Sequence, residues 1–313
     1  MTLTQLRTFV EVAATGSVRR AAEHLFVSPP AVSAALHALE NELGVALVRR
    51  EGRGLVVTAP GAVFAGYARR VLGLLDEAVT ATTGETDPEL GRVRLAAVTT
   101  AGEHVLPRFL ASFRSQHEHA EISLEVGNKA RVWDLLDNHE VDLAIGGRPP
   151  TPRRFCTLAT RPNALVVVAA PAKKPPGRPR RRAPAIVAEL EESVWLLREP
   201  GSGTRSTTLE LFEELNISPR TLTLGSNGAI RQSVQLGLGI TLMSRDAVAR
   251  ELDTGDLEEW AIPGGPRLRW WHLVGRRDED LPPTARLFLR HLTAAAVPRS
   301  ECFRPVTAAV SDG

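Results

Sequence analysis

Residues 17–44, SVRRAAEHLFVSPPAVSAALHALENELG, predict two short helices joined by a tight turn at Phe26-Val27-Ser28. Ser28 can cap the second helix by accepting a hydrogen bond from an early backbone N–H, and Pro29 and Pro30 suit its first turn. This layout is typical of a helix-turn-helix, whose second helix enters the major groove of DNA. A helical hairpin inside an ordinary core is the alternative, and the residues that follow argue against it. The apolar positions at helical spacing are Ala21, Ala22, Leu25, Val32, Leu36 and Leu39.

Residues 45–58, VALVRREGRGLVVT, predict a hairpin of two short strands that turns at 51–54. Three arginines, Arg49, Arg50 and Arg53, surround its tip. Arginines next to a recognition helix suit contacts to DNA phosphates, which fix the register without reading bases. A solvated hairpin tip is the alternative, and the adjacent helix-turn-helix favours the DNA contact.

A long helix is predicted from residue 59 to about 83. Phe64, Val71 and Ala78 lie seven residues apart, and apolar residues at 67 or 68 and at 74 or 75 fill the intervening positions. This spacing resembles a coiled-coil seam. Because the helix has no partner nearby in the sequence, we expect it to pair with a second copy in a homodimer. Residues 84–88, GETDP, are expected to break the helix and form a hinge.

From Gly91 onward, predicted strands alternate with predicted helices, which indicates an α/β fold of parallel sheets with helices on both faces. The length of nearly 200 residues suits two lobes with a cleft between them. A basic, proline-rich segment at 172–184 is expected to be a mobile loop. The predicted domains are 1–58, the linker helix and hinge at 59–88, lobe I at 89–163 plus 269–297, lobe II at 164–268, and a disordered tail at 298–313.

Composition excludes several classes of protein. The 313 residues carry a net charge of +2, and six basic groups belong to residues 172–184, so acidic residues outnumber basic ones elsewhere. Global charge therefore does not indicate nucleic-acid binding; the helix pattern does. No run of 18 apolar residues and no export signal is found, and two distant cysteines do not indicate a disulfide framework. These features predict a cytoplasmic protein.

The chain resembles the LysR-type transcriptional regulators. The resemblance is carried by LRTFVEVAATGS at 6–17, AAEHL at 21–25, AVSAALHALENELGVALVRR at 31–50, and Thr58 before Gly61. It implies a winged helix-turn-helix, a dimerising linker helix and a two-lobed effector domain similar to periplasmic binding proteins, assembled as a homodimer or homotetramer. It also implies that effector binding closes the lobes and changes dimer packing, the bend of the DNA operator and access for RNA polymerase. The stretches 128–150 and 197–212 resemble the branch that controls carbon-fixation operons, which responds to phosphorylated sugars, related metabolites or nicotinamide nucleotides.

The recognition helix departs from the family pattern at two positions. Pro29 stands where the family usually has Gln, and Ala34 stands where it often has Arg. Those two side chains are the ones that pair with adenine and guanine edges. Base reading then falls to Ser33, His37 and apolar contacts with thymine methyls, and we expect greater reliance on DNA shape and on the hairpin arginines. The candidate DNA-binding residues are Ser28, Pro29, Pro30, Ser33, Ala34, His37, Arg49, Arg50 and Arg53.

Small polar residues follow three predicted strands, at Thr99-Thr100, Ser202-Gly203-Thr204 and Ser226-Asn227. In open parallel sheets, ligands bind beyond the carboxyl ends of the strands, where helix N-termini favour anions. Each residue alone could be an ordinary helix cap, but the three junctions together predict a site for a small anionic metabolite. Arg148 can neutralise the anion, and Arg205 is a weaker candidate. The candidate effector residues are Thr99, Thr100, Arg148, Ser202, Gly203, Thr204 and Asn227.

An enzyme is not expected, because no Ser, His and Asp are spaced as a triad and no histidines show metal-ligand spacing. No metal or cofactor is predicted. The rival function is that of a solute-binding sensor without DNA regulation. The predicted winged helix argues against this rival.

We expect Arg53→Ala to weaken operator binding, because recognition by DNA shape depends on the phosphate contacts of the hairpin. A gel-shift assay measures this against Ser33→Ala. An Arg53→Ala protein that binds as well as the parent, while Ser33→Ala abolishes binding, would contradict the hypothesis.

Overall fold

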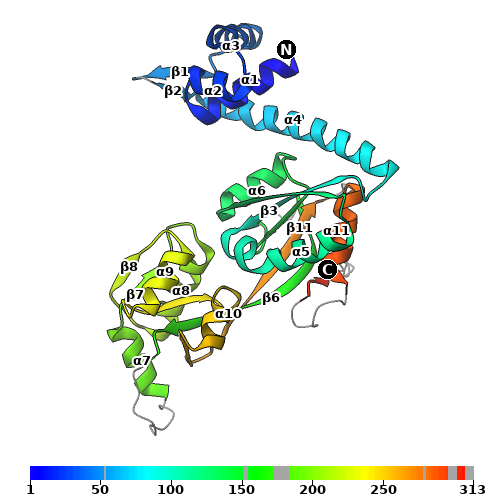
Figure 1. Cartoon of the computed structure of the whole chain (residues 1–313). Coiled ribbons are helices and arrows are strands. Elements are labelled where there is room, and N and C mark those ends of the chain that lie inside the picture. Colours follow the sequence, from blue (N-terminus) through cyan, green and yellow to red (C-terminus); the bar gives the residue numbers. More distant parts are fainter. Residues whose placement is uncertain (53, 151–153, 172–182, 278–279, 295–301, 307–313) are drawn as a thin grey trace, which may run out of the picture.

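The computed structural model describes residues 1–52, 54–150, 154–171, 183–277, 280–294 and 302–306. Figure 1 shows a helical amino-terminal domain with a small hairpin, one long helix that leads away from it, and two α/β lobes. This is the predicted architecture. None of the helices in the described ranges combines the length and apolarity that a bilayer crossing requires.

Three helices form the amino-terminal domain: α1 (Leu3–Thr15), α2 (Val18–Leu25) and α3 (Pro29–Leu43). Ser28 caps α3, since its side chain accepts a hydrogen bond from the Ala31 N–H. The cap ends the α2–α3 turn within three residues, as the sequence predicts. The helices close around a core of Phe9, Val12, Ala21, Ala22, Val32, Leu36, Leu39, Leu47 and Ala65.

The hairpin consists of antiparallel strands β1 (Val48–Glu51) and β2 (Gly54–Val57). It is tied to α3 by the Glu40 carboxylate, which accepts hydrogen bonds from the backbone N–H of Leu47 at 2.7 Å and of Val48 at 3.2 Å. These bonds hold the hairpin in a fixed position beside α3.

The long helix α4 (Ala59–Thr86) begins at Thr58, whose side chain accepts a hydrogen bond from the Gly61 N–H. It ends at Thr86, three residues later than expected, because Pro88 disfavours a helical conformation at Asp87, the residue before it. The predicted seam is also corrected at one position. Phe64 packs against Phe9 of the core, with ring centroids 5.5 Å apart, and Val63 is exposed in its place. The exposed large apolar residues of α4 are Val63, Tyr67, Val71, Leu74, Leu75 and Val79.

The carboxyl-terminal half of α4 is fastened to the nearer lobe by buried charges. Arg94, whose side chain is only 4% exposed, pairs with Asp76 of α4 at 2.8 Å and with Asp142 at 2.7 Å. Arg276 pairs with Glu77 of α4 at 2.6 Å. The Arg276–Glu77 pair is buried on both sides, with side chains 7% and 10% exposed, so separating its partners would leave a desolvated charge. This pair joins α4 to lobe I ahead of the expected hinge at 84–88.

One eight-stranded sheet runs through both lobes in the order β10-β6-β11-β5-β3-β4, and β9 and β12 also pair with β6. The prediction of purely parallel sheets was wrong. Strands β3, β4 and β5 are parallel, but β6 and β11 are antiparallel to each other, and β11 is antiparallel to β5. The strands are β3 (Arg92–Val98), β4 (Glu121–Gly127), β5 (Leu143–Gly146), β6 (Phe155–Ala169), β9 (Thr241–Ser244), β10 (Glu258–Trp260), β11 (Arg267–Arg276) and β12 (Arg304–Pro305).

Figure 1 shows β6 and β11 crossing from lobe I, which contains β3, β4 and β5, into lobe II. In lobe I, a π-helical turn η1 (Ala101–Val105), α5 (Leu106–Gln116) and α11 (Pro283–Thr293) pack on one face of the sheet, and α6 (Lys129–Asp137) packs on the other. In lobe II, β7 and β8 form a small parallel sheet. The lobe II elements are α7 (Ala183–Glu192), β7 (Trp195–Leu197), α8 (Gly203–Leu215), β8 (Thr221–Thr223), α9 (Asn227–Gln235) and α10 (Arg245–Thr254).

Two expected loops differ from the structure. Part of the expected disordered tail is ordered, because Phe303 fills the lobe I core beside Phe109, with ring centroids 6.0 Å apart, and β12 pairs with β6. Residues 298–301 and 307–313 lie outside the described residues. The basic loop at 172–184 lies outside them up to residue 182, and residues 183 and 184 begin α7.

We expect Gly73→Ala to destabilise the chain by about 1–3 kcal/mol, because an added Cβ would lie 2.2 Å from the Asn138 carbonyl oxygen where α4 meets lobe I. Gly66→Ala in the same helix is the matched control, since its Cβ meets nothing within 4 Å. There the better helix propensity of Ala should stabilise by up to about 1 kcal/mol. Thermal unfolding of both variants measures the difference, and equal shifts would contradict the close approach.

Candidate nucleic-acid interface and ligand cleft

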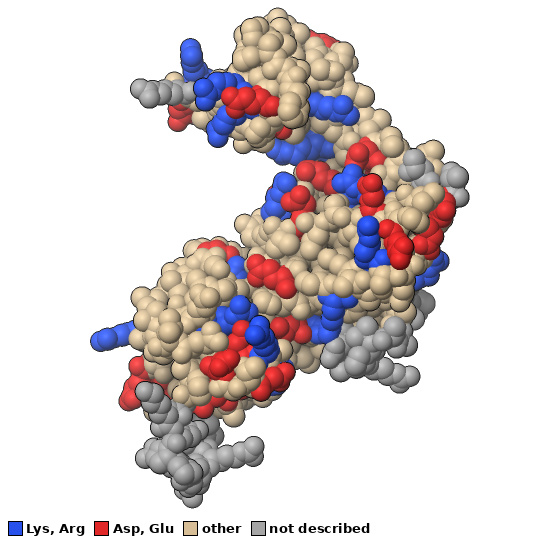
Figure 2. Space-filling model, viewed as in Figure 1, with Lys and Arg blue, Asp and Glu red and all other residues tan. Residues whose placement is uncertain are grey.

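The exposed face of α3 is almost free of charge. Pro29, Pro30, Ala34 and His37 are exposed, and Ser33 is half-buried. Between residues 24 and 39 the sequence has no Lys, Arg, Asp or Glu. Figure 2 shows the result as a largely tan surface over the end of the molecule where α3 lies. The exposed face of α3 therefore lacks the charged side chains that recognition helices usually use to contact base edges.

The hydrogen bond of His37 assigns the roles of its ring nitrogens. Nδ1 lies 2.8 Å from the backbone oxygen of Ser33, which can only accept, so Nδ1–H donates. In the neutral ring, Nε2 is then an acceptor on the exposed side. Such an acceptor matches the exocyclic amino groups of cytosine and adenine in the major groove.

The hairpin arginines differ in their partners. Arg49 pairs with Glu51 at 2.6 Å. Arg50 is exposed and forms no ion pair with any described residue, so its charge is available to an anion. Arg53 lies outside the described residues. Figure 2 shows basic side chains at the hairpin end of the amino-terminal domain.

A cleft of about 730 Å³ lies between the two lobes. Lobe I contributes the residues that follow β3 and β5, and lobe II contributes the start of α8. The structure brings six of the seven predicted effector residues together in its lining: Thr99, Thr100, Arg148, Ser202, Gly203 and Thr204. A volume of this size fits a small-molecule ligand.

The seventh predicted residue, Asn227, lies behind the lining and supports it. Its side-chain amide donates a hydrogen bond to Thr100 Oγ1 at 3.0 Å, and its Oδ1 accepts one from Arg198. Asn227 is 6% exposed. Asn227 therefore links Thr100 of lobe I to Arg198 of lobe II behind the cleft. Arg205, the weaker candidate, donates to the Arg198 backbone oxygen at 2.8 Å and does not line the cleft.

Several further residues line the cleft that the sequence did not predict. Strand β4 is followed by Asn128 and Lys129, and strand β7 by Arg198. These three could have been predicted by the strand-end rule, which is that ligands bind beyond the carboxyl ends of parallel strands. Arg269, Trp270 and His272 gave no signal, because they lie within β11, which enters the cleft antiparallel to the strands that defined it.

The positive charge in the cleft is only partly neutralised. Arg198 pairs with Glu199 at 2.7 Å, and Arg269 pairs with Glu210. Arg148 and Lys129 form no ion pair within the described part of the chain. The Ser202 side chain makes no capping hydrogen bond, so the first N–H groups of α8 are left for another acceptor. Two available cations and an uncapped helix N-terminus favour an anion.

The pKa of His272 depends on the positive charge in the cleft. Burial lowers the pKa of the His272 imidazole below its ordinary value, and the positive charge of Arg148 lowers that pKa further. The neutral ring is therefore favoured. An anion placed beside Arg148 would offset the repulsion and make protonation of His272 easier.

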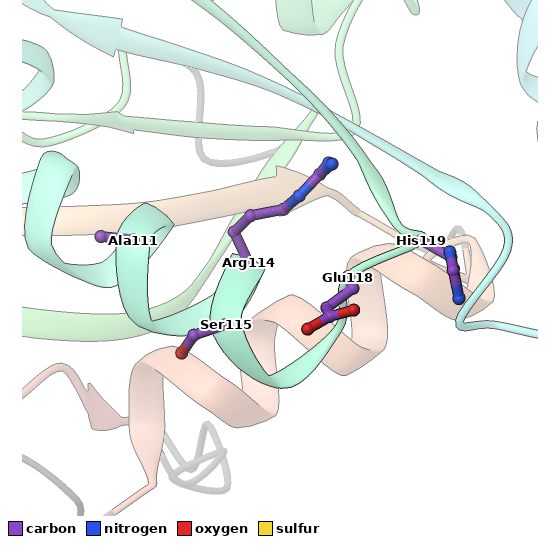
Figure 3. A pocket seen from close by; sticks show the side chains of 5 residues that line it. All are labelled: Ala111, Arg114, Ser115, Glu118 and His119. Atoms are coloured by element: carbon purple, nitrogen blue, oxygen red, sulfur yellow. The ribbon is translucent and has the colours of Figure 1, made fainter.

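A second hollow, of about 490 Å³, lies on lobe I at the end of α5 and is lined by Ala111, Arg114, Ser115, Glu118 and His119. Figure 3 shows that the four polar side chains among them point in different directions. Arg114 is occupied by the Ala120 backbone oxygen at 3.2 Å. The hollow does not gather groups around a ligand. Across the described residues, no group of three or more His, Cys, Asp or Glu is placed to hold a metal ion.

Comparisons with known proteins agree with this two-part design. A family described as "Bacterial regulatory helix-turn-helix protein, lysR family" matches residues 3–62, and "LysR substrate binding domain" matches residues 86–297. The chain belongs to the LysR family of DNA-binding transcriptional regulators with an effector-binding domain.

Two regulators illustrate the similarity over the whole length. The HTH-type transcriptional regulator CfxR of Cupriavidus necator is 34% identical over 301 residues, which cover 94% of this chain and 92% of that protein. The RuBisCO operon transcriptional regulator of Allochromatium vinosum is 34% identical over 304 residues, which cover 96% and 98%. The solved regulatory domain of Synechocystis CcmR in complex with 2-PG is 30% identical, with a TM-score of 0.57, and covers 66% of this chain and 98% of that one.

We expect Arg148→Ala to raise the pKa of His272 without restoring its ordinary value, because the repulsion disappears and the burial remains. Titration of the imidazole signals by NMR measures the change. Arg114→Ala is the control, since it removes a cation of lobe I outside the cleft. An unchanged His272 pKa in Arg148→Ala would show that the two groups do not interact.

Proposed function

We propose that this protein binds operator DNA in the bacterial cytoplasm and controls genes of carbon fixation in response to a small anionic metabolite held between its lobes. The observation that supports this most is the cleft, which is lined by two available cations, Arg148 and Lys129, and by the uncapped start of α8. The similarity to a RuBisCO operon regulator supports the choice of target genes.

The ligand chemistry is that of a phosphate or carboxylate. The cleft offers cations, the hydroxyls of Thr99, Ser202 and Thr204, and free backbone N–H groups, which together suit several acceptor oxygens on one anion. The related CcmR domain was solved with 2-PG, which is the ligand we would test first.

The exposed apolar stripe of α4 supports assembly. A helix of 28 residues that leaves Val63, Tyr67, Val71 and Leu74 exposed has an unfilled apolar surface. A second copy packed along it would place two α3 helices on successive major grooves of a two-fold operator. Homodimers of this kind could associate further into homotetramers that contact RNA polymerase.

Three strands connect the cleft to α4. Strand β3 has Arg94 near its start and leads to Thr99 and Thr100. Strand β5 begins after Asp142 and leads to Arg148. Strand β11 has His272 at the cleft and Arg276 at its far end. At those far ends, Arg94 pairs with Asp76 and Asp142, and Arg276 pairs with Glu77. A shift of these strands on lobe closure would therefore reach the linker helix directly.

A solute-binding sensor without DNA regulation remains the rival function, and it leaves the amino-terminal domain without a role. The match of residues 3–62 to a regulatory helix-turn-helix family favours the regulator.

We expect the protein to shift the upstream intergenic DNA of its own gene in a gel at low salt, where counterion release favours binding. We expect 2-PG to change the affinity or the mobility of that complex. In Arg148→Ala the DNA binding should persist, but the response should need at least about tenfold more ligand, because a charge-assisted contact is lost.

Arg114→Ala, outside the cleft, should respond as the parent does. Absence of any DNA shift at low salt would overturn the regulator. DNA binding with an equal ligand response in parent and Arg148→Ala would overturn the placement of the anion.

A further inference from the structure

Both the backbone conformation and the solvent exposure of Phe26 are unfavourable for a phenylalanine. It is the residue that ends α2, its φ is 54°, and its side chain is 96% exposed. The left-handed backbone region is costly for any residue with a bulky side chain and is ordinarily taken by Gly or Asn. Full exposure of a phenylalanine ring also forgoes the hydrophobic gain of burying it.

The other two non-glycine residues with this conformation in the described ranges have local reasons for it. Asn216 is the residue type that tolerates the left-handed region, and His139 is held by a hydrogen bond to Glu77 at 2.8 Å. Phe26 takes part in none of the ring contacts among the described residues. Folding therefore gives no reason for a phenylalanine here.

Its surroundings point to DNA. Phe26 lies two residues before the cap of α3, and Val27, at 48% exposed, joins it to the exposed Pro29 and Pro30. These exposed residues lead directly along the sequence into α3, and residues 24–39 contain no carboxylate to repel phosphates. Since Pro29 and Ala34 cannot make the polar base contacts usual at their positions, apolar contact has more of the binding to supply.

We propose that Phe26 is a DNA-contacting residue whose ring packs on deoxyribose carbons and thymine methyl groups at the edge of the groove that α3 enters. The proposal rests on operator binding by α3. It extends the recognition surface from the helix into the turn, and makes part of the affinity apolar and therefore independent of salt.

The substitution Phe26→Gly tests the proposal, because it should stabilise the helix-turn-helix while it weakens operator binding. Glycine relieves the backbone conformation, so hydrogen exchange over residues 17–44 of the full chain should become slower. Operator affinity, measured by fluorescence anisotropy, should fall roughly five- to tenfold, as expected when partial burial of one phenylalanine is lost. The slope of log affinity against log salt should stay unchanged, whereas Arg50→Ala should reduce it by about one.

Two control variants match the separate parts of this change. Asn216→Gly relieves the same backbone conformation in lobe II, and Leu236→Ala removes an 87% exposed apolar side chain there. Neither should alter operator affinity.

Each alternative outcome is distinct. Unchanged affinity with slower exchange would overturn the proposal, since the ring then does not touch DNA. Faster exchange together with weaker binding would overturn it as well, because Phe26 would then be structural. A changed oligomeric state by light scattering, with unchanged affinity for a half-site, would assign the ring to a second copy instead. If the parent itself fails to bind at low salt, the proposed function falls and this proposal falls with it.

Discussion

Arg94 is almost entirely removed from water, and its guanidinium is balanced by Asp142 beside it and by Asp76 on the linker helix. A second buried arginine, Arg276, is balanced by Glu77 one residue further along α4. Burial alone would raise the pKa of the Glu77 carboxyl, but hydrogen bonds from His139 and Arg276 outweigh it and hold that pKa below its usual value. Because the Arg276–Glu77 pair is buried on both sides and a desolvated charge needs its partner in place, this pair above all sets how α4 lies on lobe I. The relation between the DNA-binding domain and the effector domain depends on it.

The DNA-binding domain combines a conventional frame with an unusual contact surface. Its frame follows from capping and apolar spacing, which place α3 on the outside of a small core. On that outer face, the polar groups available for bases are the Ser33 hydroxyl and the His37 ring, and the charges belong to the neighbouring hairpin. On such a surface, contacts to phosphates supply affinity, and DNA shape together with apolar contacts supplies specificity.

The strand-end rule accounts for how far the cleft could be predicted. Thr99, Thr100 and Arg148 follow parallel strands, and Ser202, Gly203 and Thr204 open a helix, so their positions in the sequence already place them at one edge. His272 and Arg269 lie inside a strand that reads as ordinary core until its antiparallel direction is known. The prediction that Asn227 binds ligand was made from the same rule, but the hydrogen bonds of Asn227 to Thr100 and Arg198 give it a supporting position.

Local sequence determined the helix-turn-helix, the hairpin, the long helix and the alternation of strands and helices, because caps, turn residues and apolar periodicity act within a few residues of one another. Only the tertiary structure decided what depends on residues far apart in the chain. That includes the antiparallel crossing of β6 and β11, the return of Phe303 to the lobe I core, and the pairing of Glu77 with Arg276. An isolated arginine or glutamate carries no signal of its partner, so the ion pairs that join α4 to lobe I could not be predicted.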